Sequence, residues 1–286
     1  MCKSLLLICI ISFAWMQSLY PLHSMPITGR DLSFSGGGGA IKSEQTSLNP
    51  SAINSSHKDI NIHTQLLPAG ISLLSLNATY PKNNIIYFVS ISNLNFGKLK
   101  DGNTDKTFSA SDLMINGGLK RNLYDRISVG ASISYTLSLI ANNVAQSVLF
   151  STGFRTEISE DRIGFGLTLR NLGIQFDHFR ETKESIPFQL QTSAFIRPQY
   201  LSAVIFSDVV MEQNIDDYII ISGIEFFPRD GLMLRISDSV LYNNRFKLNG
   251  LAFGIQFNLK KWTINLASRN LVSAGFINGV TLSKQF

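Results

Sequence analysis

One alternating stretch near the middle of the chain decides its fold: Ile127-Ser128-Val129-Gly130-Ala131-Ser132-Ile133-Ser134-Tyr135-Thr136-Leu137-Ser138-Leu139. Apolar residues occupy every second position, and small or polar residues lie between them. A period of two is typical of a β-strand whose two faces meet different surroundings. The same alternation runs through residues 163–170, 251–260 and 262–267. These patterns predict an all-β protein.

About fourteen strands of this kind can be placed after residue 58, and most reach the roughly 9–11 residues that a tilted strand needs to cross a bilayer. Short polar turns such as Asn83-Asn84 and Arg229-Asp230-Gly231 join them. An even number of antiparallel strands can close into a barrel, which leaves no unpaired edge in lipid. The strands are expected at 59–66, 70–80, 84–96, 108–121, 125–141, 144–158, 161–173, 186–197, 200–210, 216–227, 230–240, 247–260, 261–269 and 276–286.

The polar faces of these strands distinguish a membrane barrel from a soluble β-sandwich. A sandwich turns its polar face to water, where Lys, Glu and Asp are common, but here that face holds mainly Ser, Gly, Thr, Asn and Gln. Small polar residues suit the interior of a barrel whose apolar face meets lipid. Only 16% of the 286 residues are charged, against about 25% in average soluble domains. We therefore expect an antiparallel transmembrane β-barrel of about fourteen strands, integral to the outer membrane and surrounded by its lipid.

Composition also excludes two classes of protein. The chain is 44% hydrophobic and contains 20 Phe, which is too much apolar surface for a disordered protein. The formal net charge is +5, with 25 basic and 20 acidic residues. Because the basic residues are scattered singly, no nucleic-acid-binding face is indicated.

The first 24 residues are interpreted as a signal peptide. A short cationic start at Met1-Cys2-Lys3 precedes an apolar core from Leu5 to Trp15, which is too short to cross a bilayer comfortably as a membrane anchor. Cleavage after Ala14, Ser18 or Ser24 is compatible with the sequence. Both cysteines lie within this segment, so the exported chain is expected to have no disulfide, cysteine nucleophile or cysteine-bound metal.

Residues 25–58 separate the signal peptide from the barrel at 59–286 and are expected to form a plug inside it. They are rich in Gly and Ser and too irregular for a strand, yet they carry scattered apolar residues. Inside a barrel, the backbone polar groups of such a segment can find partners. Its turns are assigned to Gly36, Gly37 and Asn49-Pro50, because proline biases the preceding residue away from helix.

Five isolated charged residues fall on the expected inner face of the barrel. Such residues could bind an anion, but unpaired charges away from water are costly, so we expect them to pair as a polar network in the lumen. At the C-terminus, Phe286 lies on an apolar face, and a terminal aromatic residue is the usual assembly signal of outer-membrane barrels. The five charged residues are Arg155, Glu157, Arg170, Glu225 and Arg235.

Motifs for enzyme chemistry are incomplete. The segment from Gly36 to Ser43 nearly spells a phosphate-binding loop, but Ile41 stands where the motif requires glycine. Ser55 and Lys58 have the Ser-x-x-Lys spacing of penicillin-binding enzymes without the companion motifs. His57, His63 and His178 form no metal-binding or triad spacing. No catalytic residue, metal site or cofactor is therefore predicted.

Short words of sequence, in order along the chain, resemble the long-chain fatty-acid transporter-like barrels, a superfamily with fourteen strands and an N-terminal segment in the lumen. Within it, the chain is similar to the PorQ family of the type IX secretion system of the Bacteroidetes, which is related to PorV. The similarity covers nearly all of the mature chain. The words are Gly29-Arg30-Asp31-Leu32-Ser33-Phe34-Ser35-Gly36-Gly37, Ser47-Leu48-Asn49-Pro50-Ser51-Ala52-Ile53, Asn95-Phe96-Gly97-Lys98, Thr107-Phe108-Ser109-Ala110-Ser111-Asp112, Asp125-Arg126-Ile127-Ser128-Val129-Gly130-Ala131, Arg170-Asn171-Leu172-Gly173-Ile174-Gln175, Ile186-Pro187-Phe188-Gln189-Leu190-Gln191 and Gly250-Leu251-Ala252-Phe253-Gly254.

This resemblance implies a non-enzymatic subunit that anchors a PorZ-like surface protein within the attachment complex of type IX secretion. The chain departs from the PorQ pattern in two places: the loop from Met211 to Ile215 is short, and Gly36 to Gly39 replace the usual Ala-Leu-Gly-Gly-type word. Two alternatives stay open. One is an outer-membrane transporter for a hydrophobic ligand, which would need an apolar lumen, and the other is a PorV-like cargo shuttle.

Overall fold

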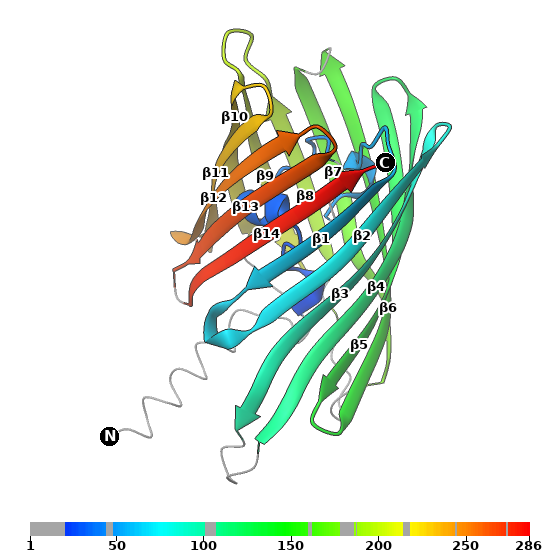
Figure 1. Cartoon of the computed structure of the whole chain (residues 1–286), viewed down its shortest axis with the longest axis vertical. Helices are drawn as coiled ribbons and strands as arrows, with labels where there is room; N and C mark the ends of the chain where they lie inside the picture. The colour runs from blue at the N-terminus through cyan, green and yellow to red at the C-terminus, as the bar shows by residue number, and fades with distance from the viewer. Residues whose placement is uncertain are drawn as a thin grey trace.

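The computed structural model describes residues 21–43, 48–100, 107–159, 162–177, 186, 188–213, 218–243, 245–272 and 274–286. Fourteen antiparallel strands form one closed barrel in which each strand pairs with its neighbours in the chain and β1 closes the ring against β14 (Figure 1). The strands are β1 (Asp59–Leu66), β2 (Ser72–Lys82), β3 (Ile85–Lys100), β4 (Thr107–Tyr124), β5 (Ile127–Ile140), β6 (Asn143–Ser159), β7 (Ile163–Asp177), β8 (Gln189–Ile196), β9 (Ala203–Glu212), β10 (Tyr218–Arg229), β11 (Leu232–Tyr242), β12 (Phe246–Leu259), β13 (Trp262–Leu271) and β14 (Gly275–Gln285).

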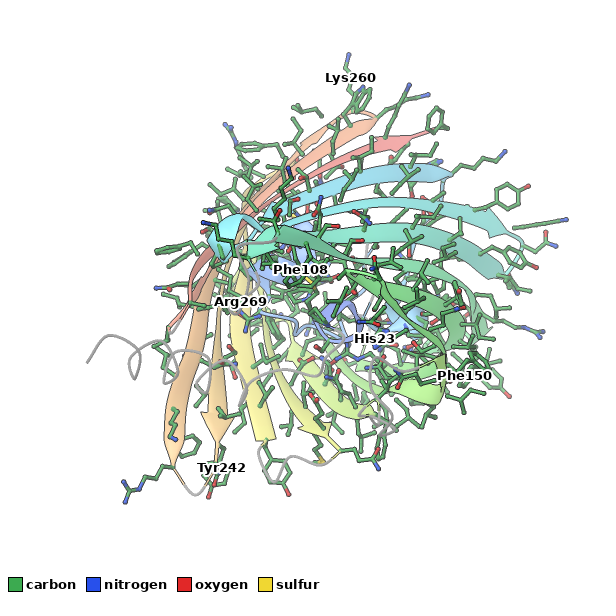
Figure 2. The ribbon with its side chains drawn as sticks, turned by 90° about the horizontal axis from the view of Figure 1, so that it is seen from below. His23, Phe108, Phe150, Tyr242, Lys260 and Arg269 are labelled. Carbon is green, nitrogen blue, oxygen red and sulfur yellow. The ribbon has the colours of Figure 1, made fainter. Side chains whose placement is uncertain are left out.

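The two faces of the wall follow the alternation in the sequence. In β5, Ile133 points outward and is 58% exposed, whereas the neighbouring Ser132 and Thr136 are buried inside. Figure 2 looks into the barrel and places His23 inside the ring of strands and Phe150 on its outer side. The outer surface is a continuous apolar belt, which is stable only in lipid. The expected fold class, a fourteen-stranded antiparallel transmembrane barrel, is confirmed, and the protein is integral to the outer membrane.

Several strands extend beyond the bounds expected from alternation, because bulges shift the period without ending the pairing. β3 continues to Lys100 past a register shift between Asn95 and Lys98, where Gly97 adopts a φ of +74°. β7 continues to Asp177 past a shift opposite Phe150 and Thr152, where Asn171 has a φ of +64°. The sequence alone places the end of a strand at such an interruption.

The two ends of the barrel differ in the connections that they carry. The end that holds the C-terminus has short turns at 83–84, 125–126, 230–231 and 260–261. The opposite end carries the longer connections, including 101–106 and 178–188. Outer-membrane barrels keep short turns on the periplasmic side and long loops outside the cell. The C-terminal end, at the top of Figure 1, therefore faces the periplasm.

The described residues before β1, 21–43 and 48–58, run through the lumen. They contain the short helices η1 (Pro21–His23), α2 (Gly29–Ser33) and η2 (Pro50–Ala52), drawn in blue inside the barrel in Figure 1. Another short helix, η3 (Pro68–Gly70), joins β1 to β2 at the extracellular end. Leu22 and His23 are buried, although they fall within the range assigned to the signal peptide. The rest of that range, 1–20, lies outside the described residues. No described helix is both long and apolar enough to cross a membrane.

Candidate functional site in the barrel lumen

Helix α2 is fixed in the lumen by its first residues. Thr28 caps the helix by accepting a hydrogen bond from the Asp31 amide at 3.0 Å. The Gly29 amide donates to the Thr281 hydroxyl of β14 at 2.9 Å. Gln65 of β1 donates from Nε2 to the carbonyls of Pro26 and Ile27, at 2.8 and 2.6 Å. These bonds hold the helix against the strands that close the barrel.

The glycine turn that follows α2 packs against β8, β9 and β10. Gly36 and Gly38 have φ values of +87° and +75°, which favour glycine. A Cβ on Gly37 would lie 2.7 Å from Ile221 and 2.8 Å from Phe206, so the wall approaches too closely for any side chain. The Gly39 amide donates to the Asp208 carboxylate at 3.0 Å. Because that backbone donor already faces a buried carboxylate, the turn has the environment of a packing element rather than a phosphate site.

The Asn49-Pro50 turn lies against β5 and β6. Asn49 accepts from the Ser51 amide at 3.0 Å and donates from Nδ2 to the Gly39 carbonyl at 2.6 Å. Two wall glycines give it room, since a Cβ on Gly130 would lie 2.4 Å from the Pro50 carbonyl carbon and one on Gly153 would lie 2.0 Å from Asn49 Oδ1. Sequence reasoning read these glycines only as small inward residues, although glycine is the usual mark of close backbone approach in a strand.

Four of the five predicted lumen charges form two separate clusters, and Arg170 lies apart from both. Arg155 pairs with Glu157, which also accepts from Lys42 Nζ at 2.8 Å, and Arg155 Nε donates to the Ala40 carbonyl at 2.5 Å. In the second cluster, Arg235 Nε pairs with Glu225 at 2.6 Å and Nη2 donates to Gln256 at 2.6 Å.

Arg170 belongs to neither cluster. It is buried beside a cavity of about 40 Å³ toward the extracellular half, with His23 and Asn171 in the same lining. Burial lowers the pKa of His23 to about 4. Its Nε2 lies 2.8 Å from the Thr136 hydroxyl, and its carbonyl accepts from Asn171 Nδ2 at 3.2 Å. The N-terminal segment is thus tied to β5 and β7 as well.

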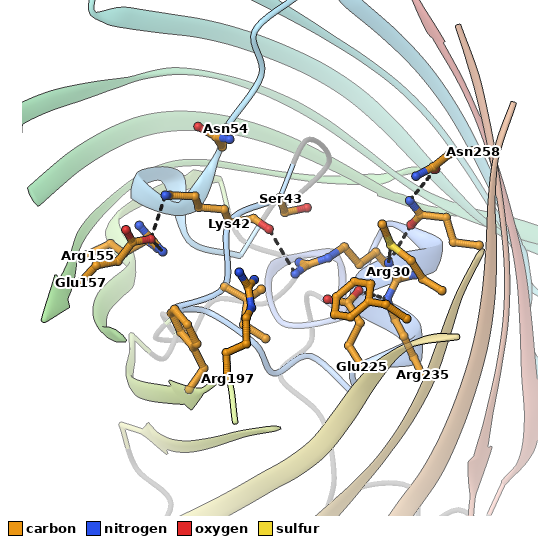
Figure 3. A pocket seen from close by; sticks show the side chains of 15 residues that line it. Arg30, Lys42, Ser43, Asn54, Arg155, Glu157, Arg197, Glu225, Arg235 and Asn258 are labelled. Atoms are coloured by element: carbon orange, nitrogen blue, oxygen red, sulfur yellow. Dashed lines mark hydrogen bonds and ion pairs between the residues drawn. The ribbon is translucent and has the colours of Figure 1, made fainter. Parts of the chain in front are cut away.

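A larger cavity of about 280 Å³, here named the periplasmic vestibule, lies between the two charged clusters at the end of the lumen that faces the periplasm (Figure 3). Arg30 of α2 and Arg197, next to β8, contribute to the same wall. The cavity is mixed in character, because aromatic and aliphatic side chains complete it. Its basic lining residues are Arg30, Lys42, Arg155, Arg197 and Arg235, its acidic ones are Glu157 and Glu225, and its apolar ones include Ile41, Phe195, Phe227 and Met233.

Sequence reasoning missed the apolar clusters inside the lumen, two of which line opposite sides of the plug. One packs Phe34 and Ile41 of the plug against inward residues of β8–β10, including Phe195, Phe206 and Ile221. The other, here named the extracellular apolar cluster, lies toward the extracellular end. It joins Leu22 and Ile27 of the N-terminal segment to Leu73, Leu94 and Met114 of β2–β4, with Met25, Leu67, Ile71 and Phe96 packed around it. The available signal was an apolar residue on the otherwise polar face, as in the run from Ala203 to Phe206.

The remaining candidate residues have structural environments. His63 is buried and lies 2.8 Å from both the Thr281 hydroxyl and Asn77 Nδ2. Ser55 donates to the Asp59 carboxylate, while the Lys58 ammonium lies 5.0 Å from the centre of the Tyr80 ring. His178 lies outside the described residues. Among the residues described here, no group of three or more His, Cys, Asp or Glu could hold a metal ion.

The C-terminal Phe286 lies at the seam of the barrel. Its side chain is 57% exposed, and its amide donates to the Lys58 carbonyl at 2.9 Å, next to the start of β1. Lys284 Nζ lies 4.7 Å from the centre of its ring.

Comparison with solved structures finds the same fold in a toluene transporter, a monoaromatic hydrocarbon channel and a FadL homologue. The toluene transporter TodX of Pseudomonas putida superposes with a TM-score of 0.72 at 10% identity, over 93% of this chain and 99% of that one. The monoaromatic hydrocarbon channel CymD gives 0.71 at 9% identity, over 92% and 98%. A FadL homologue of Pseudomonas aeruginosa gives 0.65 at 10% identity, over 92% and 99%. No protein-family model and no curated protein matches this sequence.

Proposed function

We propose that this protein is an outer-membrane transporter that takes up a small hydrophobic molecule from the extracellular end of its barrel. The observation that carries the proposal is the extracellular apolar cluster. Its inward-facing residues Leu73, Leu94 and Met114 interrupt an otherwise polar lumen near its extracellular mouth. Such a patch offers a hydrophobic ligand a binding surface. The shared fold with hydrocarbon channels supports the same reading.

The chain's own N-terminal segment occupies this surface. Leu22, Met25 and Ile27 cover it and leave an adjoining cavity of about 40 Å³. A benzene-sized ligand needs a cavity of about 150 Å³. A ligand would therefore bind by displacing these side chains, each of which contributes about 1.5–3 kcal/mol by burial. Binding energy from the ligand offsets that loss, so the N-terminal segment acts as a gate.

The test is uptake of radiolabelled toluene by cells whose intact outer membrane contains the protein. Replacing Leu22 and Met25 with Ala enlarges the cavity, and we expect faster uptake than in wild type. Met114→Gln places an amide in the pocket and is expected to slow it. Leu139→Gln, on the lipid-facing side of β5, is the matched control. Uptake equal in all four strains, at equal amounts of folded barrel, would refute the transporter.

A second candidate is the role implied by the sequence resemblance: a non-enzymatic subunit of type IX secretion that anchors a PorZ-like surface protein. One feature favours it. The plug is hydrogen-bonded on several sides of the lumen, for example through Ser237 to the Ser33 carbonyl and Ser128 to the Ser51 carbonyl, both at 3.0 Å. A plug held in this way suits a barrel that conducts nothing.

Two measurements distinguish the anchor from the transporter. In planar bilayers, an anchor shows no steady conductance until residues 25–58 are removed, and it retains a PorZ-like protein in a pull-down from mildly solubilised membranes. Toluene uptake without capture of attachment-complex subunits favours the transporter. Capture of cargo proteins alone would instead favour a PorV-like shuttle.

A further inference from the structure

Basic residues gather at the periplasmic end of the barrel. Each of the six turns there carries an exposed basic residue, here named together the basic rim: Lys82, Arg126, Arg162, Arg197, Arg229 and Lys260. Lys58 and Lys284 flank the seam between β1 and β14 at the same end. A ring of like charges produces a positive potential over the mouth of the lumen and attracts anionic partners from a distance.

The sequence shows that a net positive charge is present at one end only. The periplasmic connections contain ten basic and four acidic residues, whereas the extracellular connections contain seven basic and eight acidic ones. Glu160 and Asp161, two of the four periplasmic acids, lie outside the described residues. The periplasmic count covers 58, 82–85, 121–127, 159–163, 196–203, 229–232, 259–262 and 284, and the extracellular count covers 66–72, 98–106, 140–143, 177–188, 212–217, 243–247 and 271–275.

The periplasmic vestibule at the centre of this rim has spare basic groups. Its two carboxylates, Glu157 and Glu225, are already engaged by Arg155, Lys42 and Arg235. Arg30 and Arg197 make no ion pair with any described residue.

The hydrogen-bond donors of the vestibule are also incompletely used. Among the described residues, Arg30 donates a single long hydrogen bond, of 3.5 Å, to the Lys42 carbonyl. Arg235 is 4% exposed, yet its Nη1 is a buried donor without a partner among the described residues. Such a group is costly unless a ligand or water satisfies it. In Figure 3, Arg197 points into the space between the Arg155–Glu157 pair and Arg30.

We propose that the basic rim and the periplasmic vestibule bind an acidic segment of a periplasmic polypeptide, with one carboxylate inserted between Arg30 and Arg197. The vestibule lies inside the ring of strands, where bilayer lipids do not reach, so its ligand comes from the aqueous periplasm. A volume of about 280 Å³ exceeds the need of a single small anion. The apolar walls from Phe195 and Phe227 suit the methylene groups of a glutamate side chain.

The experiment uses the full-length protein in phosphatidylcholine nanodiscs and a fluorescently labelled hexaglutamate peptide, with binding followed by anisotropy. We expect saturable binding that weakens as salt rises, because exposed charges are screened. Arg197→Gln should weaken binding at least about fivefold, since it removes a charge-assisted hydrogen bond. Lys247→Gln removes one exposed charge from the extracellular end and should leave the affinity unchanged.

Further variants and probes keep the proposal open to refutation. Arg197→Lys should restore part of the affinity, and Arg30→Gln should weaken it in protein that still shows heat-modifiable migration. Equal binding by wild type and Arg197→Gln, or equal binding of hexaserine, would overturn the proposal. Binding of free glutarate without hexaglutamate would reassign the vestibule to a small anion. Rim-dependent binding only to phosphatidylglycerol vesicles would reassign the rim to lipid.

Discussion

Single glycines set the fit between the barrel wall and the segment inside it. Gly130 and Gly153 lie on adjacent strands and face the Asn49-Pro50 turn, whereas Gly117 lies in an open part of β4 with its nearest neighbour 3.9 Å from a would-be Cβ. The same residue type therefore has different importance at different positions, and only the neighbours distinguish them.

Gly130→Ala is expected to destabilise the barrel by about 1–3 kcal/mol, because the added methyl group would overlap the Pro50 backbone. The measurement is the temperature at which the folded band on a gel converts to the unfolded one. Gly117→Ala is the control, and its ordinary contact predicts little change. If both variants convert at the same temperature as wild type, the Asn49-Pro50 turn does not press against β5.

His23 makes the attachment of the N-terminal segment dependent on pH. Its pKa is about 4 in the folded protein and 6.5 when exposed, so the released segment binds protons more readily than the bound one. The attachment of the segment is therefore most stable above pH 6.5. It loses on the order of 3 kcal/mol of free energy as the pH falls from 6.5 to 4. The protection factors of residues 22–27, which compare hydrogen exchange with the intrinsic rate at the same pH, should fall over this range.

The variant His23→Gln isolates this effect from the other histidines of the chain. Glutamine does not titrate, so the protection factors of the same residues in the variant should be nearly constant between pH 7 and pH 4.5. A loss of protection of equal size in both proteins would assign the pH dependence to another group.

The residues on the two faces of a single strand show which face meets lipid and which meets the lumen. β5 has apolar residues outside and small polar ones inside, as its sequence alternation requires. β9 is apolar on both faces, with Ile205 toward lipid and Val204 and Phe206 buried against Phe34 of the plug. A strand that is apolar on both faces thus marks where the plug meets the wall.

Ile133→Arg should lower the stability of the inserted barrel by about 2–4 kcal/mol if the residue lies near the bilayer midplane. Ile133 is 58% exposed on the outer face, whereas Ser134 borders the smaller lumen cavity. Ser134→Arg is the matched comparison and should cost less from lipid exposure. Denaturant unfolding from vesicles measures both, and equal loss in the two variants would mean that the faces are assigned wrongly.

At the scale of the whole molecule, closure of the ring between β1 and β14 leaves no unpaired strand edge in lipid. Closure makes every strand depend on the others, including the seam at which Phe286 donates to Lys58. Residues from a segment that precedes the barrel in the sequence pack against β2–β4 and β8–β10 inside the lumen, so the core joins distant parts of the chain.

We expect the purified protein to migrate on gels as a compact band when unheated and as a slower band after boiling, because a closed hydrogen-bonded barrel resists detergent until it is heated. Fractionation should recover it with outer-membrane markers. Recovery as a soluble periplasmic monomer would contradict the barrel. Deleting Phe286 should reduce the yield of the compact band in cells, with Lys260→Gln as a control at the same end.

The sequence by itself determined the fold class, the number of strands and the two faces of the wall, because alternation is local and each strand repeats it. The lumen depended on tertiary structure. Which charges pair, that Arg170 stands apart from Arg155 and Arg235, and where Leu22 meets Met114 are contacts between residues far apart in the chain. Strand bounds at bulges and the gathering of basic turns at one end also required the closed ring, since curvature and register bring those positions together.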